Sequence, residues 1–191
     1  MGAVRPFFMG AYCAHFFCIG AIFMKKKVHF ITHAAILAAA YVALTHLQNL
    51  LLPGSATWAI QFRVSEALCV LALFTPAAIP GLTIGCLLFN VTYSAALPLD
   101  VLVGSLASCL SAVAMWMTRR VTIKGCPLLG LLMPAVFNAL LVGWELTVYI
   151  GGGFAINALY VAIGEAAVLL TLGWLLYGAI RKRHLQRRLF G

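Results

Sequence analysis

Six apolar stretches, each long enough to cross a lipid bilayer as a helix, dominate this sequence. They cover residues 28–52, 59–77, 79–97, 100–118, 127–150 and 156–180. A helix needs about 20 predominantly apolar residues to span the hydrocarbon core. With 64% apolar and 9% charged residues, the chain has too little polar sequence to cover a water-soluble globule. We therefore expect an all-α integral membrane protein, a bundle of six transmembrane helices, rather than a barrel of short alternating strands.

Proline and glycine residues separate these stretches where we expect helices to end. Proline lacks a backbone N–H and restricts the residue before it, so it interrupts a helix. The breaks are Pro53-Gly54-Ser55, Thr75-Pro76 with Pro80-Gly81, Pro98-Leu99-Asp100 and Gly151-Gly152-Gly153.

The positive charge of the chain predicts its orientation in a membrane. The net charge is +9, and most of the 13 basic residues fall into three clusters. Basic residues collect in cytoplasmic loops, so we assign this surplus to topology and not to binding of nucleic acid. An even number of spans separates each pair of clusters, which predicts that both ends of a six-helix domain over 24–180 are cytoplasmic in the cell membrane. The clusters are Lys25-Lys26-Lys27, Arg119-Arg120 with Lys124, and Arg181-Lys182-Arg183 with Arg187-Arg188, of which the last begins a basic cytoplasmic tail over 181–191.

Residues 1–23 form a segment of their own, because 6–23 is a seventh apolar stretch. One interpretation is an extra N-terminal helix with its amino end outside. A signal peptide fits poorly, since a lysine triplet follows the apolar part where a polar cleavage region should be. We favour a third interpretation, in which Met24 is the natural start and the residues before it are non-native or a wrongly assigned start.

Acidic residues within apolar spans are the strongest functional signal. A carboxylate at mid-membrane costs about 2.5–3.5 kcal/mol on insertion scales, so each one marks a candidate site. The predicted orientation brings several polar side chains from different spans into the outer half of the bundle. The predicted substrate-binding residues are Arg63, Glu66, Asn90, Asn138, Glu145 and Glu165. Asp100 is a weaker candidate, because we expect it at the outer rim in contact with water.

Aromatic residues near this level could stack on a flat ligand, although each also fits the ordinary aromatic belt at a membrane interface. They are Trp58, Phe62, Phe89, Tyr93, Trp144, Tyr149 and Tyr160. Carboxylates, amides and aromatic faces together suit a flat, polar, neutral or cationic molecule. A purine-like ring with an N–H and an exocyclic amine can donate two parallel hydrogen bonds to one carboxylate.

Sequence motifs for enzymes and cofactors are not found. The chain has no P-loop and no H-E-x-x-H motif, and no nucleophile has a base beside it, so we predict no catalytic residue and no cofactor. His29 and His33 share a helix face at the membrane edge, but we predict no metal site. The six cysteines are expected to be small buried hydrophobes.

The first span carries pairs of small residues four positions apart, which let helices approach closely in lipid. The candidates for a partner-docking surface are Ala34, Ala38 and Ala39 within the set Ala34, Ala35, Ala38, Ala39, Ala40 and Ala43. Packing within the bundle explains this spacing equally well. Gly81 with Gly85, and Gly104 with Ser108, are weaker pairs of the same kind.

Several motifs, in order along residues 24–180, resemble the QueT family. They are Gln61-Phe62-Arg63-Val64-Ser65-Glu66-Ala67-Leu68, Ala78-Ile79-Pro80-Gly81-Leu82-Thr83-Ile84-Gly85-Cys86 with Asn90, Asp100 with Gly104-Ser105-Leu106-Ala107, Phe137-Asn138-Ala139-Leu140 with Glu145-Leu146, and Gly164-Glu165. Residues 1–23 lie outside the resemblance.

The resemblance implies an S-component of an energy-coupling factor (ECF) transporter, a six-helix substrate-binding membrane subunit. Such a subunit carries queuosine precursors, which are 7-deazaguanine bases with a cyano or aminomethyl group. It binds substrate from outside and docks, through its alanine-rich first helix, on a T-component driven by two cytoplasmic ATPases. Ala34, Ala38 and Ala39 fit that helix. One acid would then pair with the guanine-like edge and a second with an aminomethyl ammonium.

Other functions remain open at this stage. The chain could be an S-component or an ion-coupled carrier for another small metabolite, such as a different purine or a vitamin, since intramembrane carboxylates can relay protons. An intramembrane enzyme using one of the acids is a further alternative. A structural subunit without a ligand leaves the converging acids unexplained.

Overall fold

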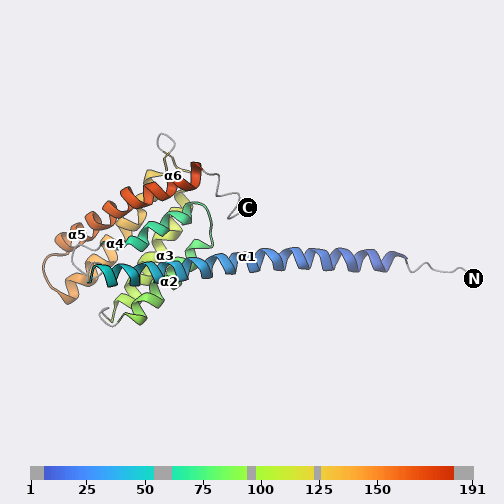
Figure 1. The fold of residues 1–191 in the computed structure, drawn as a ribbon, viewed down its shortest axis with the longest axis horizontal. Helices are drawn as coiled ribbons and strands as arrows, with labels where there is room; N and C mark the ends of the chain where they lie inside the picture. Colours follow the sequence, from blue (N-terminus) through green and yellow to red (C-terminus); the bar gives the residue numbers. More distant parts are fainter. Residues whose placement is uncertain (1–6, 54–61, 94–97, 123–125, 183–191) are drawn as a thin grey trace, which may run out of the picture.

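The chain folds into a bundle of helices in a computed structural model (Figure 1). The structure describes residues 7–53, 62–93, 98–122 and 126–182, with side chains from residue 27 onward. Its elements are α1 (Phe7–Leu51), the 3₁₀-helix η1 (Val64–Leu73), α2 (Ala78–Thr92), α3 (Asp100–Thr118), α4 (Leu128–Tyr149), α5 (Phe154–Val168), the π-helical turn η2 (Leu169–Gly173) and α6 (Trp174–Lys182). These ranges contain no β-strand, which confirms the all-α expectation.

Four of the helical stretches are long and apolar enough to cross a bilayer. They are Lys27–Leu51, Asp100–Thr118, Leu128–Tyr149 and Phe154–Lys182, the last made of α5, η2 and α6 in continuous succession. Two shorter apolar helices, η1 and α2, lie where the second and third spans were predicted. The described residues therefore hold an apolar helical segment at each of the six predicted positions, and four of the six have spanning length.

The second segment departs from the prediction in form. The span expected over 59–77 is a ten-residue 3₁₀-helix, η1. At a rise of about 2.0 Å per residue, η1 is about 20 Å long, shorter than the roughly 30 Å hydrocarbon core. Pro76 follows its carboxyl end and cannot donate a backbone hydrogen bond. Residues 54–61, where the predicted span began, lie outside the described residues.

Helix η1 is the centre of the bundle. It contacts every other helical element that the structure describes. Eight of its ten side chains are buried, from Ser65 to Leu73 with the exception of Leu68. A helix that is apolar on all sides needs neighbours on all sides, and the apolar core of the bundle forms around Cys69, Val70 and Ala72.

Small residues let α1 and α2 pack closely. A Cβ atom on Gly81 would lie 2.8 Å from the backbone oxygen of Ala34, and one on Gly85 would lie 2.8 Å from Cβ of Tyr41. Ala34 and Ala38 are buried on this face of α1, whereas Ala39 is exposed. Two of the three docking candidates are therefore occupied by packing within the chain, and only Ala39 lies on an accessible face.

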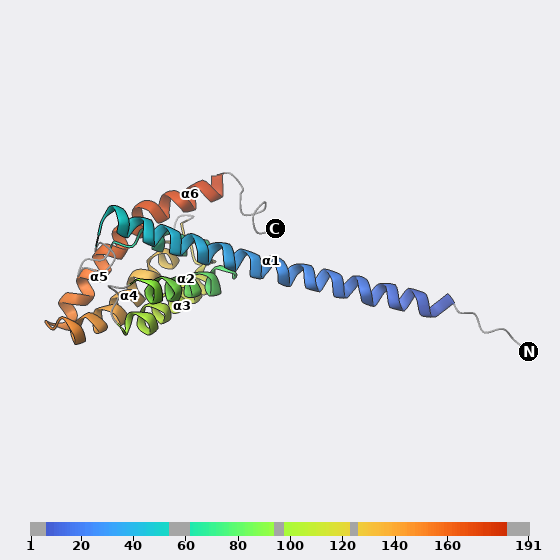
Figure 2. The same ribbon diagram turned by 60° about the horizontal axis from the view of Figure 1, so that its bottom comes forward.

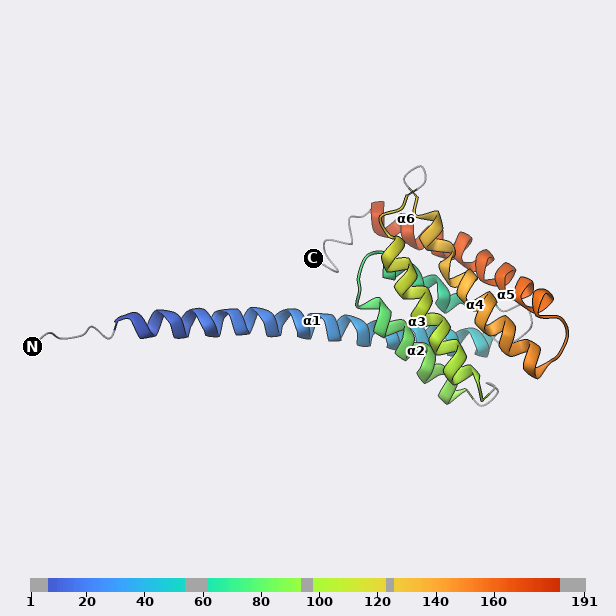
Figure 3. The ribbon, with the colours of Figure 1, turned by 180° about the vertical axis from the view of Figure 1, so that it is seen from behind.

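The first helix is longer than predicted and is not divided. Residues 7–51 form one continuous α-helix of 45 residues, about 67 Å at 1.5 Å per residue. Figures 1, 2 and 3 agree that its N-terminal part projects beyond the other helices. Residues 7–23 therefore continue the helix of the first span without a break. No proline lies between residues 7 and 51, and lysine is a good helix former, so the Lys25-Lys26-Lys27 triplet does not interrupt the helix.

The distribution of polar and apolar side chains is that of a membrane protein. Large apolar side chains such as Leu102, Val148 and Ile163 point outward and are more than half exposed. Many polar side chains are buried instead, among them Thr45, Ser65, Ser111 and Asn157. An outer surface this rich in apolar groups fits hydrocarbon and not water.

Candidate polar ligand site

All four acidic side chains of the chain lie inside the bundle. Their exposed fractions are 0% for Glu66, 6% for Asp100, 0% for Glu145 and 1% for Glu165. They come from four elements, η1, α3, α4 and α5. The sequence analysis placed Asp100 at a water-exposed rim, but its side chain is buried at the start of α3. A bundle that exposes no carboxylate to lipid avoids the cost of a charged group in hydrocarbon.

Glu66 is held by hydrogen bonds on both carboxyl oxygens. The hydroxyl of Tyr41 on α1 donates to Oε1 at 2.6 Å, and the thiol of Cys69 donates to Oε2 at 3.0 Å. Side chains at i and i+3 of a 3₁₀-helix eclipse one another, which places Cys69 directly beside Glu66. Glu66 is therefore an internally bonded carboxyl group, fixed between α1 and η1.

Arg63 supplies positive charge at the start of η1. Its side chain is only 3% exposed, and its charge interacts with the carboxyl groups of Glu66 and Asp100. The same charge acts on Glu145 and Glu165. One guanidinium group thus lies within electrostatic range of all four acids.

Asn90 fixes the position of Asp100. Its Nδ2 donates a 2.7 Å hydrogen bond to the backbone oxygen of Asp100, which ties α2 to the first residue of α3. The side chain is 4% exposed. Gly104 leaves room for this contact, since a Cβ atom there would lie 2.8 Å from Nδ2 of Asn90 and 3.9 Å from Nη1 of Arg63.

Glu145, Glu165 and Asn138 differ from Glu66, because they carry buried polar atoms without a hydrogen-bond partner. Among the residues that the structure describes, no partner bonds to either carboxyl oxygen of Glu145, to Oε2 of Glu165 or to Nδ2 of Asn138. Glu145 interacts electrostatically with Asp100, and Glu165 with Glu66. Asn138 lies beside Glu165. Buried polar groups are normally hydrogen-bonded, so these atoms are donors and acceptors to which a polar ligand could bind.

The structure thus brings together all six sequence-predicted site residues, with Asp100 as a seventh. Four carboxyl groups and one guanidinium group thus lie together, all buried in the bundle. We call these seven residues the polar cluster: Arg63, Glu66, Asn90, Asp100, Asn138, Glu145 and Glu165.

The sequence analysis missed the polar residues of α1 that support the cluster. Beyond Tyr41, the hydroxyl of Thr45 donates to Ser65 at 2.8 Å. The amide oxygen of Gln48 accepts a 2.7 Å hydrogen bond from the backbone N–H of Val64, and its nitrogen donates to the backbone oxygen of Phe62. Residues 41, 45 and 48 follow helical spacing and continue the inward face of Ala34 and Ala38, which is the signal that could have identified them.

The aromatic candidates are mostly on the outer surface. Phe62, Trp144, Tyr149 and Tyr160 are exposed, as expected for an interfacial belt. Phe89 is buried and stacks on Tyr93 with 5.2 Å between ring centroids, next to Asn90 in α2. Trp58 lies outside the described residues. Among the described aromatic candidates, only Phe89 is buried as the polar cluster is.

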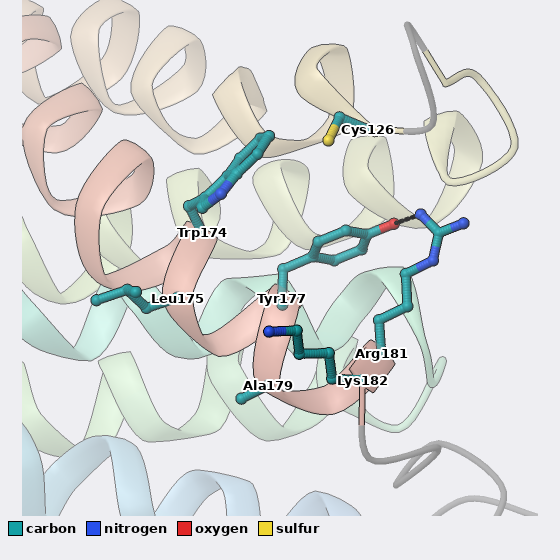
Figure 4. Close-up of a pocket in the computed structure, with 8 residues that line it drawn as sticks. Cys126, Trp174, Leu175, Tyr177, Ala179, Arg181 and Lys182 are labelled. Carbon is teal, nitrogen blue, oxygen red and sulfur yellow. Dashed lines mark hydrogen bonds between the residues drawn. The ribbon is translucent and has the colours of Figure 1, made fainter.

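A separate hollow lies at the C-terminal end of the bundle (Figure 4). It is lined by Cys126 and by residues of α6, including Trp174, Tyr177, Arg181 and Lys182. Nη1 of Arg181 donates a 3.1 Å hydrogen bond to the hydroxyl of Tyr177 across its edge. No member of the polar cluster lines this hollow, so it is distinct from the candidate site. Within the described ranges, no three His, Cys, Asp or Glu side chains are arranged to hold a metal ion.

The fold and the cluster define a class, a polytopic helical membrane protein with a buried polar site. The sequence model of the QueT transporter family matches residues 31–182. The chain therefore belongs to the QueT transporter family, a family of membrane transport proteins, as the resemblance indicated. No curated protein and no solved structure shows a significant match.

Proposed function

We propose that this protein is the substrate-binding S-component of an ECF-type importer and that it takes up a queuosine precursor, a 7-deazaguanine base. The observation that carries this proposal is the set of unpartnered polar atoms on Glu145, Glu165 and Asn138, buried among helices of a transporter-family protein. A deazaguanine has the matching groups, because its edge carries N–H and amine donors and a carbonyl acceptor.

The partners follow from what this chain lacks. The sequence has no P-loop, so ATP-driven uptake needs a T-component and two cytoplasmic ATPases on other chains. The three basic clusters favour a cytoplasmic position for both ends of the six-helix domain, and this orientation would turn Glu145 and Glu165 toward the outside. In this orientation the site receives substrate from the exterior.

Identification of the bound molecule tests the proposal. The full-length protein is purified from its native host in mild detergent, and small molecules that co-purify are identified by mass spectrometry. Binding of queuine and of the aminomethyl and cyano deazaguanines is then measured by isothermal titration calorimetry. We expect Glu145→Gln and Glu165→Gln each to weaken binding at least tenfold, about 1.4 kcal/mol. If both variants bind as tightly as the unmodified protein, Glu145 and Glu165 do not bind the substrate.

A matched control separates loss of binding from loss of folding. Thr171→Val changes an exposed residue of η2 whose hydroxyl bonds only within its own helix, to Ala167 and Val168. It should bind as the unmodified chain does. Binding of a vitamin or another purine in place of any deazaguanine would support an S-component of different specificity, and uptake that persists without the ATPases would support an ion-coupled carrier.

A further inference from the structure

The hollow at the C-terminal end of the bundle takes no part in the proposed function. We propose that it binds an anionic phospholipid, with the phosphate headgroup at Arg181 and Lys182 and an acyl chain beside Trp174 and Leu175. The inference rests on the geometry and the charge of the hollow, so it holds whatever substrate the polar cluster binds.

The hollow is large enough for a lipid headgroup, and it is accessible. Its volume is about 630 Å³, within the range of about 300–1,000 Å³ that is typical of small-molecule sites. Gly178 forms part of its wall, and no atom lies within 4 Å of the position that a Cβ atom would take there. Trp174 and Leu175, which also line it, are 41% and 68% exposed. The space therefore opens on the outer surface of the bundle, which faces lipid.

The lining of the hollow changes from apolar to charged along α6. Trp174, Tyr177 and Arg181 follow one another along this helix, as Figure 4 shows, and Lys182 is the next residue. Arg181 lies about 10 Å beyond Trp174 at 1.5 Å per residue. Because α6 ends the spanning stretch Phe154–Lys182, the charged end lies at the membrane interface and the aromatic end nearer to the hydrocarbon. A phospholipid presents its phosphate and its acyl chains in the same order.

Every charged side chain that lines the hollow is positive. Arg181 and Lys182 line it, whereas all four acidic side chains of the chain lie in the polar cluster. Guanidinium N–H groups match the oxygens of a phosphate in pairs. A zwitterionic headgroup also carries an ammonium group, for which no carboxylate side chain is present here. The basic clusters favour a cytoplasmic position for this end, and the cytoplasmic leaflet carries the anionic lipids.

Tyr177 orients Arg181 at the edge of the hollow. Its hydroxyl accepts a 3.1 Å hydrogen bond from Nη1 of Arg181, and the guanidinium carbon lies 6.0 Å from the centroid of its ring. The same ring stacks on Phe74 with 5.5 Å between centroids, and Phe74 packs against the apolar core. The guanidinium group is thus oriented before a ligand binds, which lowers the entropic cost of binding.

Lipid binding by the full-length protein tests the proposal. The protein in detergent is titrated with phosphatidylglycerol or with phosphatidylcholine of equal chain length, and bound lipid is counted by native mass spectrometry. We expect phosphatidylglycerol to bind at least tenfold more tightly. In the double variant Arg181→Gln/Lys182→Gln this preference should fall toward one. Arg119→Gln/Arg120→Gln is the matched control, because it removes two adjacent charges directly after α3, outside the hollow.

A second variant tests the hollow itself. Gly178→Leu fills the space without a change in charge, so it should weaken binding of phosphatidylglycerol at least tenfold. If Gly178→Leu does not fold, the double variant and its control decide.

Four outcomes would overturn the proposal. Equal affinities for the two lipids would show that an anionic headgroup is not recognised. A preference that survives the double variant would place the lipid elsewhere. A preference that survives in folded Gly178→Leu would reflect surface charge alone. Binding of glycerol phosphate as tight as that of phosphatidylglycerol would identify a free phosphate compound, and not a lipid, as the ligand.

Discussion

The hydroxyl group of Tyr41 donates a 2.6 Å hydrogen bond to Oε1 of Glu66, joining α1 to η1 across 25 positions of sequence. Both side chains are fully buried. This bond makes Glu66 a fixed part of the cluster, in contrast to Glu145.

Removal of this hydroxyl should destabilise the protein. Tyr41→Phe leaves a buried carboxyl oxygen without its donor, which costs about 1–3 kcal/mol. We expect a lower thermal unfolding temperature in detergent. Tyr177→Phe is the control, since its hydroxyl bonds Arg181 at the exposed edge of α6. Equal unfolding temperatures for the two variants would contradict the structural role of Tyr41.

Replacing Glu145 by glutamine and replacing Glu66 by glutamine should change the thermal stability in opposite directions. Glu145→Gln should raise the thermal stability of the ligand-free protein, because it replaces a buried carboxyl group that makes no hydrogen bond among the described residues. Glu66→Gln should lower it by about 1–3 kcal/mol, because one of two donors then faces an amide nitrogen. Differential scanning calorimetry compares the two. A loss of stability in Glu145→Gln would argue that its oxygens are bonded in the folded protein.

Close packing of α1 on α2 should not tolerate a larger residue. In Gly85→Ala the new Cβ atom would lie 2.8 Å from Cβ of Tyr41 and 3.1 Å from the backbone oxygen of Ala38. Overpacking of this kind costs about 1–3 kcal/mol. Gly178→Ala is the matched control, because no atom lies within 4 Å of its added Cβ. A Gly85→Ala protein as stable as the control would mean that the two helices separate without cost.

A docking role for α1 is now testable at Ala39. Ala39→Leu adds bulk on the exposed face and should spare ligand binding while reducing co-purification with the T-component. Ala38→Leu is not a clean test, because Ala38 is buried against Gly85 and its replacement should destabilise the bundle itself. Assembly of Ala39→Leu at the unmodified yield would exclude this face of α1 as the docking surface.

The sequence predicted the positions of the six apolar segments because length and apolar content are properties of the sequence itself. It did not predict that residues 64–73 form a 3₁₀-helix, since an all-apolar segment carries no periodic pattern that distinguishes three residues per turn from 3.6. Contacts on all sides of η1 set that geometry.

The sequence also did not predict which face of α1 packs against the bundle. Ala34, Ala38 and Ala39 are chemically identical, so spacing alone could not decide which of them faces α2. The burial of Tyr41, Thr45 and Gln48 on the same side as Ala34 and Ala38 decides it. The convergence of the acids was predictable because the cost of a carboxylate in hydrocarbon drives each one inward, whatever helix carries it.

The central position of η1 links two residues of the polar cluster to every other described helix. Arg63 and Glu66 belong to the one segment that all the other described helices share as a neighbour. A substitution at either residue therefore alters the packing of η1 against all of these helices at once, whereas a substitution in a peripheral helix reaches fewer neighbours.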